Sequence, residues 1–549
     1  MRFPFVSMTV TVAFLAACGG STSKDDAVTD PGAEVAQDAE VMEVATEIPG
    51  EVPPEAVEEI APEVPVEEVV TPPVPFGQEN RGYKMLRGIV HLHSNWSHDG
   101  CYPQHEEIDP SLLVDCETEH RRAPCQAGID FVMQTDHPGD VSDATFEQAL
   151  HYRPEAGDQL LNGSNGRLTA NKVTCPDGSL VPSFLYFVGT EGSKNMPIGL
   201  SAPVPADLWR VSYDDATPIA DAQAAIAKVH EMGGYAFVCH PEQGDLSVET
   251  IKALPLDGIE LFNFHPMLMA ALGDGFDQFL RVDSFMNAGT TNPVPDLAIL
   301  LLMAPIANDP LKFDASTPYI RLTGFGATDI HRNVEVPPLC PSFEECGDYT
   351  YDYPNFAHLL ADGGPVMLAD GDRMDSFVRS FRWMSNHTLV AADKPQDVDE
   401  VRQAIGLGRS FMAFDMMGMP KGFDFFAVAD GNPVEMGKEI AGTTAVKMYL
   451  RAPTLAKTPW TLPDYPAWTE GQSGATMRTK VLKATTAGVQ TVLDETGEGR
   501  TFEIAVDGPG AYRVEVWVTP RHLRAGLKGV EDLAEKEVPY LYSNAIMVR

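Results

Sequence analysis

The stretch of sequence that decides the fold is Gly88-Ile89-Val90-His91-Leu92-His93-Ser94-Asn95-Trp96-Ser97-His98-Asp99-Gly100. Its apolar beginning predicts a strand, and side chains two residues apart on a strand point the same way. His91 and His93 would therefore aim two imidazoles at one point, which suits a zinc, manganese or iron ion. An acid in the following loop can reach the same ion. The stretch predicts a metal centre at the end of a strand.

Further histidines and acids follow along the chain, each at the end of an apolar run. The run before His240 also comes after a helical pattern, Asp221 to Glu231, whose apolar residues share one face and which stops at two glycines. Metal ligands on successive strand ends, separated by helices, predict an α/β fold: a β/α barrel with its site at the C-terminal ends of the strands. These motifs are Thr135-Asp136-His137, Gly189-Thr190-Glu191, His240-Pro241 and Ala327-Thr328-Asp329-Ile330-His331.

Taken together, the motifs resemble the polymerase and histidinol phosphatase (PHP) domain family. The resemblance covers roughly residues 84 to 335 and depends on all five motifs occurring in order. It implies a distorted barrel of about seven β/α units. It also implies a hydrolytic centre with two or three divalent ions (zinc, manganese or iron). The sequence contains no Gly-x-Ser-x-Gly elbow and no P-loop, which argues against a serine hydrolase or a nucleotide-driven enzyme.

The resemblance further implies a role for each candidate residue. Asp136 is expected to orient an imidazole from behind a metal ligand. Arg332 is a candidate for binding a substrate oxyanion, although an arginine beside a ligand is as often a solvated charge. Glu260 and Asn263 are expected to line the cleft, with His265 as a candidate substrate contact. The implied ligand sets are His91, His93, Glu191 and Asp329 for one ion, Asp99, His137 and His331 for a second, and Glu191 with His240 for a third, with Glu191 bridging.

The sequence departs from the family pattern after the third motif. The family places a histidine several residues after the glutamate, whereas this chain continues Gly192-Ser193-Lys194-Asn195-Met196-Pro197. An amide or thioether is a poor ligand for these metals, so we expect two firmly held ions and a weak or empty third position. His98 competes with Asp99 as the first-motif ligand, and the Ser-x-Asp-Gly spacing favours Asp99.

The N-terminal region resembles a bacterial lipoprotein leader. Residues 1–18 combine an early arginine, a short apolar run and the lipobox Leu15-Ala16-Ala17-Cys18. Cys18 would become the lipid-modified first residue, and the absence of an aspartate after it favours the outer membrane; an ordinary secretory signal is the alternative. Residues 19–76 are rich in acids, proline, valine and alanine, which predicts a disordered, extended tether.

The charge of the chain excludes one class of partner. The formal net charge is −40, and no basic stretch offers a groove for phosphates. A nucleic-acid-binding protein needs such a groove, so we expect no nucleic-acid partner. The expected partners are a small-molecule substrate and, through the lipid anchor alone, a membrane.

Cysteine usage agrees with an exported protein. After Cys18 an odd number remains, so at least one thiol stays free, and Cys239 is expected to be that buried thiol. Cys340 and Cys346 are close enough for a loop disulfide. The other four are expected to pair among themselves with unknown connectivity: Cys101, Cys116, Cys125 and Cys175.

The C-terminal part reads as a second domain. We expect the barrel, with insertions, over residues 77–422 and a small antiparallel β-sandwich over residues 423–549, because runs such as Tyr512–Val518 alternate in polarity. A helix over Val398–Leu407 and the closing segment resemble those of the carbaryl hydrolase group within the PHP proteins.

The sequence thus predicts a metal-dependent hydrolase of a phosphoester or related ester, in which a metal-bridging hydroxide is the nucleophile. Without the third-motif histidine, we expect a preference for diesters or neutral esters over phosphomonoesters. The group that the C-terminal region resembles suggests a carbamate or carboxylic-ester hydrolase as the alternative. A function of another class, a non-catalytic surface-binding lipoprotein with a metal-holding scaffold, also fits the sequence.

Overall fold

The computed structural model describes residues 70–549 apart from 102–109, 206–210, 243–244, 265–293, 304–308, 337, 339–340, 343, 345–357, 360, 369 and 443–444. Val70–Arg549 belong to one compact unit. The predicted leader and all but the last few residues of the predicted tether lie outside the described residues, as do His265, Cys340 and Cys346. Among the described helices, none has the length and apolar character needed to span a membrane.

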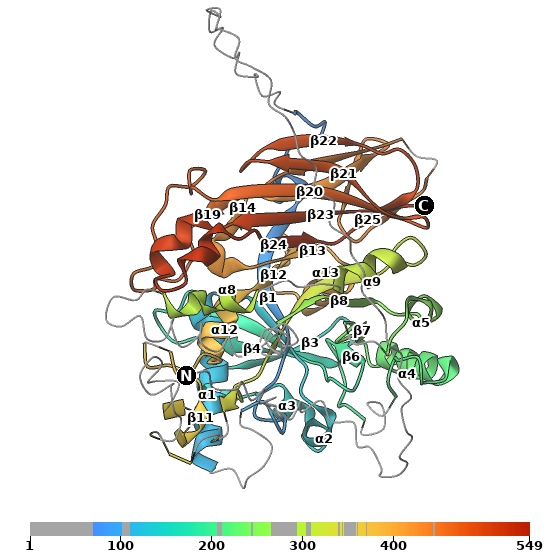
Figure 1. The fold of residues 1–549 in the computed structure, drawn as a ribbon. Helices are drawn as coiled ribbons and strands as arrows, with labels where there is room; N and C mark the ends of the chain where they lie inside the picture. Colours follow the sequence, from blue (N-terminus) through green and yellow to red (C-terminus); the bar gives the residue numbers. More distant parts are fainter. Residues whose placement is uncertain are drawn as a thin grey trace, which may run out of the picture. The chain divides into compact units, whose positions relative to one another are not determined.

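A closed barrel of mixed α/β architecture forms the centre of this unit (Figure 1). Parallel pairings run from β5 through β2, β1, β9 and β8 to β7, and β6 joins β7 in antiparallel fashion. A bridge between Val188 and Leu200 connects the end of β5 to the residues just after β6. The barrel strands are β1 (Tyr83–Leu92), β2 (Phe131–Gln134), β5 (Ser183–Val188), β6 (Asn195–Ile198), β7 (Tyr235–Val238), β8 (Gly258–Asn263) and β9 (Thr323–Ile330).

Helices connect most of these strands, but the units are less regular than the expected seven. The link between β5 and β6 holds only residues 189–194, which is too short for a crossover helix, so the chain turns back as a hairpin, with backbone hydrogen bonds from Thr190 to Pro197 and from Gly192 to Asn195. The hairpin of β3 (Gln159–Asn162) and β4 (Leu168–Thr174) precedes β5 and pairs with it. The helices are α1 (Pro110–Ala127), α2 (Pro138–Val141), α3 (Phe146–Ala149), α4 (Ile219–Glu231), α5 (Val248–Ala253), α8 (Ile299–Leu302), α9 (Asp309–Ser316), α12 (Phe377–Trp383) and α13 (Val398–Gly406).

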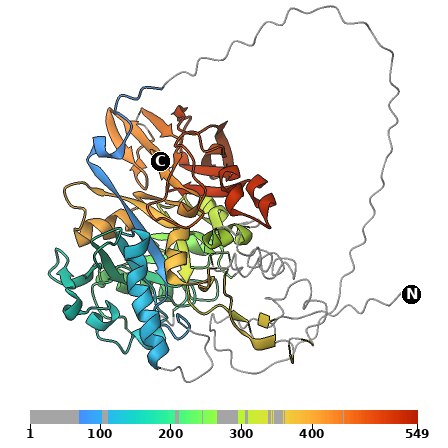
Figure 2. The ribbon, with the colours of Figure 1, turned by 90° about the vertical axis from the view of Figure 1, so that its left-hand side faces the viewer.

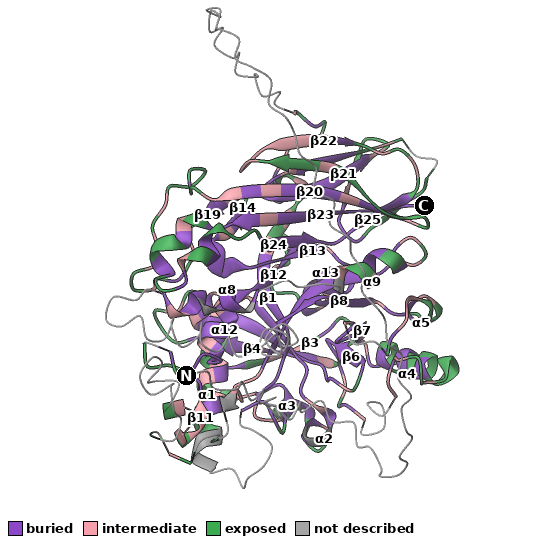
Figure 3. Cartoon of the chain, viewed as in Figure 1, coloured by how far each residue is buried: buried purple, intermediate pink, exposed green. Residues whose placement is uncertain are grey.

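Local sequence explains these elements. The helix predicted from Asp221 to Glu231 is confirmed as α4, whose Ala222, Ile226 and Val229 are buried on one face. The predicted helix near Val398 is confirmed as α13, which begins at the N-cap Asp397, whose carboxylate accepts two backbone N–H groups. The barrel strands are buried almost throughout, whereas α4 and α5 carry exposed residues (Figure 3). α1 and α12 pack side by side against the barrel (Figures 1 and 2).

The region after the barrel is built from antiparallel sheets. β12 pairs with β1, β13 with β12, and β24 with β13, so the barrel wall continues into β23, β20 and β21. Strands before and after residue 423 therefore share one sheet, and a separate sheet has the order β16-β15-β18-β22. The strands are β12 (Ser385–Ala391), β13 (Ser410–Ala413), β15 (Asp424–Ala429), β16 (Asn432–Glu435), β18 (Val446–Arg451), β20 (Thr476–Thr485), β21 (Gly488–Thr496), β22 (Thr501–Ala505), β23 (Gly510–Thr519) and β24 (Val538–Ser543), with the short pairs β10 (Glu335–Val336) and β11 (Gly364–Pro365), β14 (Met419–Lys421) and β19 (Thr454–Ala456), and β17 (Glu439–Ile440) and β25 (Ile546–Val548).

The described cysteines pair as expected. Disulfides join Cys101 to Cys116 and Cys125 to Cys175, and Cys239 is free and buried. The first disulfide ties the loop after β1 to α1, and the second ties the end of α1 to the segment before β5. The first disulfide therefore braces the loop that carries the first motif.

Candidate metal centre

The C-terminal ends of the barrel strands hold three residues in an unusual backbone conformation. His91, His240 and Asp329 have φ values of 63°, 49° and 46°, in the left-handed region that non-glycine residues seldom adopt. Such strain persists only where the surroundings hold it, and it concentrates at functional sites. Each of these residues ends or follows a barrel strand, so the strain turns its side chain into the barrel mouth.

A first group of possible metal ligands consists of His91, Glu191, His240 and Asp329. All four are buried, and one ligand atom from each lies within 4.8 Å of the others. The Nε2 atom of His91 lies 3.2 Å from Glu191 Oε2 and 3.1 Å from Asp329 Oδ1. The Nε2 atom of His240 lies 2.8 Å from Glu191 Oε1. Two imidazoles and two carboxylates at these separations match the ligand chemistry of a divalent transition metal.

A second group consists of His93, Asp99, His137 and His331, again with one ligand atom each within 4.8 Å. Asp99 Oδ2 lies 3.3 Å from His137 Nε2 and 3.5 Å from His331 Nε2. His93 connects the two groups, because its Nε2 atom is also 3.1 Å from Glu191 Oε2. The described residues therefore contain two adjoining candidate sites. The first has two histidines and two acids, and the second has three histidines and one acid.

These groupings differ in detail from the expected ones. His240, expected with a third ion, lies in the first group, and His93, expected there, lies in the second while still facing Glu191. The side chain of His98 is 42% exposed and its Nε2 atom is 4.0 Å from Asp99, so Asp99 rather than His98 belongs to the second group. All eight candidate ligands predicted from the sequence thus meet in one place.

The five imidazoles present the same nitrogen to the acids. In each ring Nδ1 has a partner of its own, which leaves Nε2 facing the centre. For His91, His137 and His331 that partner is an oxygen acceptor, as in metal sites where outer residues fix the histidine tautomer. His240 Nδ1 faces the Asn263 amide and also lies 3.5 Å from Glu242 Oε1, the oxygen that can hold its proton. Two of these Nε2 atoms and Asp329 Oδ1 are buried without a hydrogen bond of regular geometry, so the residues fit a cation. The Nδ1 partners are Glu260 for His91 at 2.5 Å, Ser97 for His93 at 3.0 Å, the Glu191 carbonyl for His137 at 3.1 Å, Asn263 for His240 at 3.3 Å and the Asp329 carbonyl for His331 at 3.0 Å.

The electrostatics of the centre favour positive charge. Burial alone would raise the pKa of Glu191 and Asp329, but the neighbouring histidines, His91 foremost, outweigh it and hold both pKa values well below their usual range. Burial would lower the pKa of His137, yet Asp99 and Glu191 raise it to about 10. The acids therefore favour protonation of the site histidines other than His93, whose pKa burial lowers, and a divalent cation would displace those protons.

Glu260 is a functional residue that the sequence analysis had placed only as lining the cleft. It is fully buried. Its Oε1 atom faces His91 Nδ1, and its Oε2 atom accepts the backbone N–H of His240 at 2.7 Å and the Asn263 amide at 3.1 Å. Glu260 therefore orients one histidine through its ring and another through its backbone. A carboxylate in a wholly apolar strand was the available signal.

Asp136 does not make the expected contact, whereas the expectation for Arg332 concerns a substrate and stays a prediction. The Asp136 carboxylate accepts the backbone N–H and the hydroxyl of Ser94, at 2.6 and 2.8 Å, and no imidazole. Burial raises its pKa to about 6. Arg332 Nε lies 2.8 Å from Glu119 Oε2, so its guanidinium is engaged by an acid of α1. Asp136 therefore braces the loop at Ser94 rather than an imidazole.

Lys194 occupies the segment where the expected histidine is missing. Its side chain is fully buried, and Nζ donates to the His240 carbonyl at 2.8 Å, with Asp245 at 3.4 Å. The neighbouring Lys312 donates to the Pro241 carbonyl. Two ammonium groups thus hold the left-handed turn that directs His240 at Glu191. The neighbouring Asn195 donates to the Val211 carbonyl and Met196 is buried in the core.

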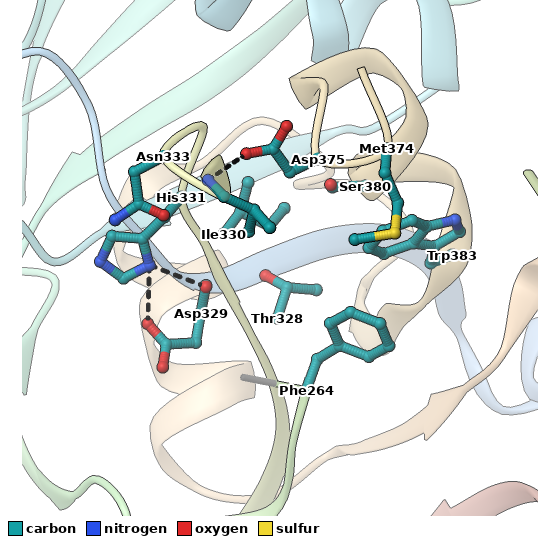
Figure 4. A pocket seen from close by; sticks show the side chains of 11 residues that line it. Phe264, Thr328, Asp329, Ile330, His331, Asn333, Met374, Asp375, Ser380 and Trp383 are labelled. Atoms are coloured by element: carbon teal, nitrogen blue, oxygen red, sulfur yellow. Dashed lines mark hydrogen bonds and ion pairs between the residues drawn. The ribbon is translucent and has the colours of Figure 1, made fainter. Parts of the chain in front are cut away.

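A small cavity adjoins the centre. His331 and Asp329 form one wall, and Phe264, Met374 and Trp383 lie across from them (Figure 4). The indole of Trp383 packs against the ring of Phe264, with centroids 4.7 Å apart. The candidate ligands therefore border an apolar recess.

Comparisons with known proteins add little to this description. No protein-family model matches the sequence, and no curated protein matches it. Among solved structures, the chain is similar to a two-domain protein from Bacteroides vulgatus that contains a predicted PHP-like metal-dependent phosphoesterase. The identity is 12%, the match covers 87% of this chain and 98% of that one, and the TM-score is 0.27. A likeness this weak says nothing about activity, which has to be inferred from the site itself.

Proposed function

We propose that the protein is a metal-dependent hydrolase acting on a phosphoester or a related ester. The observation that carries the proposal is the pair of adjoining ligand groups. The two groups meet where Glu191 of the first lies 3.1 Å from His93 of the second. Two divalent ions held there would polarise the ester and lower the pKa of a bound water towards neutrality. The resemblance of the motifs to PHP proteins supports the same reaction class.

The protein's own residues have definable parts in this reaction. Glu191 offers Oε2 to His91 and His93 and Oε1 to His240, so it is placed to bridge two ions. Asp99, His137 and His331 would hold the second ion at a less buried position, which is the side open to a substrate. Glu260 keeps the proton of His91 on Nδ1 and so keeps Nε2 available as a ligand.

The charge of the centre supports a substrate of low charge. Glu191, Asp329, Asp99 and Glu260 supply four buried carboxylates, whose charge two divalent ions would neutralise. A neutral centre attracts a phosphomonoester dianion weakly, and the net charge of −40 opposes anions further. We therefore propose a phosphodiester or neutral ester as the substrate, with two filled metal sites and a third that is weak or empty.

The test is an assay of the full chain loaded with zinc or manganese. The substrates are 4-nitrophenyl phosphate, bis(4-nitrophenyl) phosphate and 4-nitrophenyl acetate, each measured again after chelation and dialysis. We expect metal-dependent turnover with the diester ahead of the monoester. Equal activity after metal removal would refute the proposal, and a clear preference for the acetate would favour the carbamate or carboxylic-ester alternative.

The non-catalytic alternative is tested with the double variant His91→Ala/His93→Ala. An enzyme loses both turnover and tightly bound metal in this variant. A scaffold protein would show no turnover in either form on any of the three substrates, and elemental analysis would still find metal in the wild type.

We also propose that the chain is a lipoprotein of the bacterial cell envelope, anchored through Cys18 and carried on an acidic tether, with an outer-membrane location. The support is the lipobox Leu15–Cys18 alone. Labelling of cells with a radioactive fatty acid should mark the wild type and not Cys18→Ser. Equal labelling of both would refute the anchor.

A further inference from the structure

The cavity beside the metal centre has a volume of about 30 Å³. It is bordered by candidate metal ligands and by apolar side chains. His331 and Asp329 belong to the two ligand groups, and each contributes to the wall. Phe264, Met374 and Trp383 lie across the recess in Figure 4 and are at least nine-tenths buried. The recess therefore lies directly beside two of the candidate ligands.

Several of the polar groups that line the cavity make hydrogen bonds within the protein. The Thr328 hydroxyl donates to the His91 carbonyl at 2.9 Å. The indole N–H of Trp383 donates to the Asp296 carbonyl at 3.1 Å. These groups have satisfied their hydrogen bonds, so the surface they leave towards the cavity is mainly carbon.

Besides the candidate ligand Asp329, the wall contains a second acid, Asp375. Its Oδ2 atom accepts the backbone N–H of Val334 at 2.7 Å, and Arg373 binds both carboxylate oxygens, at 2.8 and 3.0 Å. The bidentate arginine neutralises its charge. The charge of Asp375 is therefore satisfied within the protein, and the side chains of Phe264, Met374 and Trp383 give this part of the cavity an apolar surface.

We propose that the cavity receives a short alkyl arm of the substrate, so that the substrate class is an ester carrying a small apolar substituent on or next to the reacting centre. This proposal rests on the proposed function. A buried water needs about 10–15 Å³ of such space, so about 30 Å³ accommodates an arm of about two or three carbon atoms. A longer arm or a ring would meet Phe264 and Trp383.

The experiment measures binding separately from turnover. The probes are monoanionic O-methyl alkylphosphonates with methyl, ethyl, propyl and hexyl arms, titrated into the zinc-loaded full chain by calorimetry. Each methylene that enters the recess should tighten Kd roughly fourfold, from about 0.8 kcal/mol of transfer free energy at 1.36 kcal/mol per tenfold. The gain should end at the propyl arm.

Two variants change the size of the recess in opposite directions. Met374→Ala enlarges it, and the hexyl arm should then bind more tightly than the propyl arm. Ser380→Thr adds a methyl group from α12, and the advantage of propyl over methyl should shrink at least fourfold. The matched control is Met448→Ala on β18, a fully buried methionine remote from the cavity walls, which should keep the wild-type dependence on arm length.

The outcomes separate the two proposals. Affinities that do not depend on arm length in the wild type, or the same dependence in Met374→Ala and Met448→Ala, would overturn the assignment of the cavity while leaving hydrolysis intact. Ethyl and propyl probes that bind as expected, with no metal-dependent turnover of alkyl 4-nitrophenyl phosphates bearing the same arms, would support the cavity and refute the hydrolase.

Discussion

Glu260→Gln gives the sharpest test of how the metal centre is organised, because both carboxylate oxygens of Glu260 act as acceptors. Oε1 faces His91 Nδ1 at 2.5 Å, and Oε2 accepts the His240 backbone N–H at 2.7 Å and the Asn263 amide at 3.1 Å. Glutamine has the same shape but a single acceptor oxygen. Neither orientation of its amide can accept hydrogen bonds both from His91 Nδ1 and from the His240 and Asn263 donors.

Each orientation harms the site in a different way. If the amide oxygen replaces Oε2, the NH₂ group faces His91 Nδ1 and favours the tautomer with the proton on Nε2. That nitrogen is the one 3.2 Å from Glu191 and 3.1 Å from Asp329, so a proton there blocks a ligand position. If the amide is reversed, the NH₂ group meets the donors of His240 and Asn263.

The expected effect follows from the lost bond. A hydrogen bond to a charged group contributes about 1.5–3 kcal/mol, and outer residues of metal sites typically change affinity by about 10- to 100-fold. We expect zinc to bind Glu260→Gln about 10- to 100-fold more weakly, measured by competition with a chromophoric chelator. Glu435→Gln is the control, because its buried carboxylate pairs with Arg81 away from the centre and should alter stability without altering zinc affinity. A zinc Kd for folded Glu260→Gln within twofold of the wild type would refute this reasoning.

Three further predictions concern the supports of the site and the fold. Lys194→Met removes the ammonium bound to the His240 carbonyl and should weaken zinc binding about 10-fold in equilibrium dialysis; an unchanged Kd would show that the turn holds without it. Replacing Cys101 and Cys116 by serine opens a loop with a sequence separation of 15 and should lower the free energy of unfolding by about 3 kcal/mol in urea titrations, whereas equal midpoints would contradict a stabilising disulfide. Burial would raise the pKa of Asp415, but Arg87 and His387 hold it below its usual value. The stability that ionised Asp415 contributes to the folded state is therefore complete above the unfolded pKa of about 3.9. It is lost as the pH falls through the lower folded pKa. Asp415→Asn should therefore destabilise the protein by about 3–5 kcal/mol at pH 7, and the difference from the wild type should shrink below about pH 4; a difference independent of pH would refute the assignment.

The proximity of the candidate ligands could be predicted from the sequence because each motif is short. His91 and His93 are two residues apart on a strand, and the period of the strand alone puts them on one side. Asp329 and His331 follow the same rule. The buried thiol of Cys239 could also be predicted, because an odd cysteine inside an apolar strand has no room for a partner.

The residues that support the site could not be predicted in the same way. The Glu260 carboxylate contacts the His91 ring although the two residues are 169 positions apart in the sequence. No local sequence pattern predicts such a contact. Lys194 attracted attention only as the place where a histidine was missing, since its role depends on the carbonyl of His240, which becomes a neighbour through the β6–β7 pairing. The hairpin in place of a β/α unit between β5 and β6 likewise follows from a short link whose direction the sequence does not state.

The position of β1 in the barrel has a consequence for how the chain is made. Val90 lies on the first barrel strand, yet its carbonyl is met by the Thr328 hydroxyl, 238 residues further along, and Lys84 pairs with Val390 on β12. At about 5–20 residues per second, a ribosome needs on the order of tens of seconds to supply those partners. During that interval the edges of β1 that later meet β9 and β12 are open, and open strand edges are sites of aggregation. Production of this protein in cells should therefore depend on slow growth, low temperature and holding chaperones more than on the stability of the finished barrel.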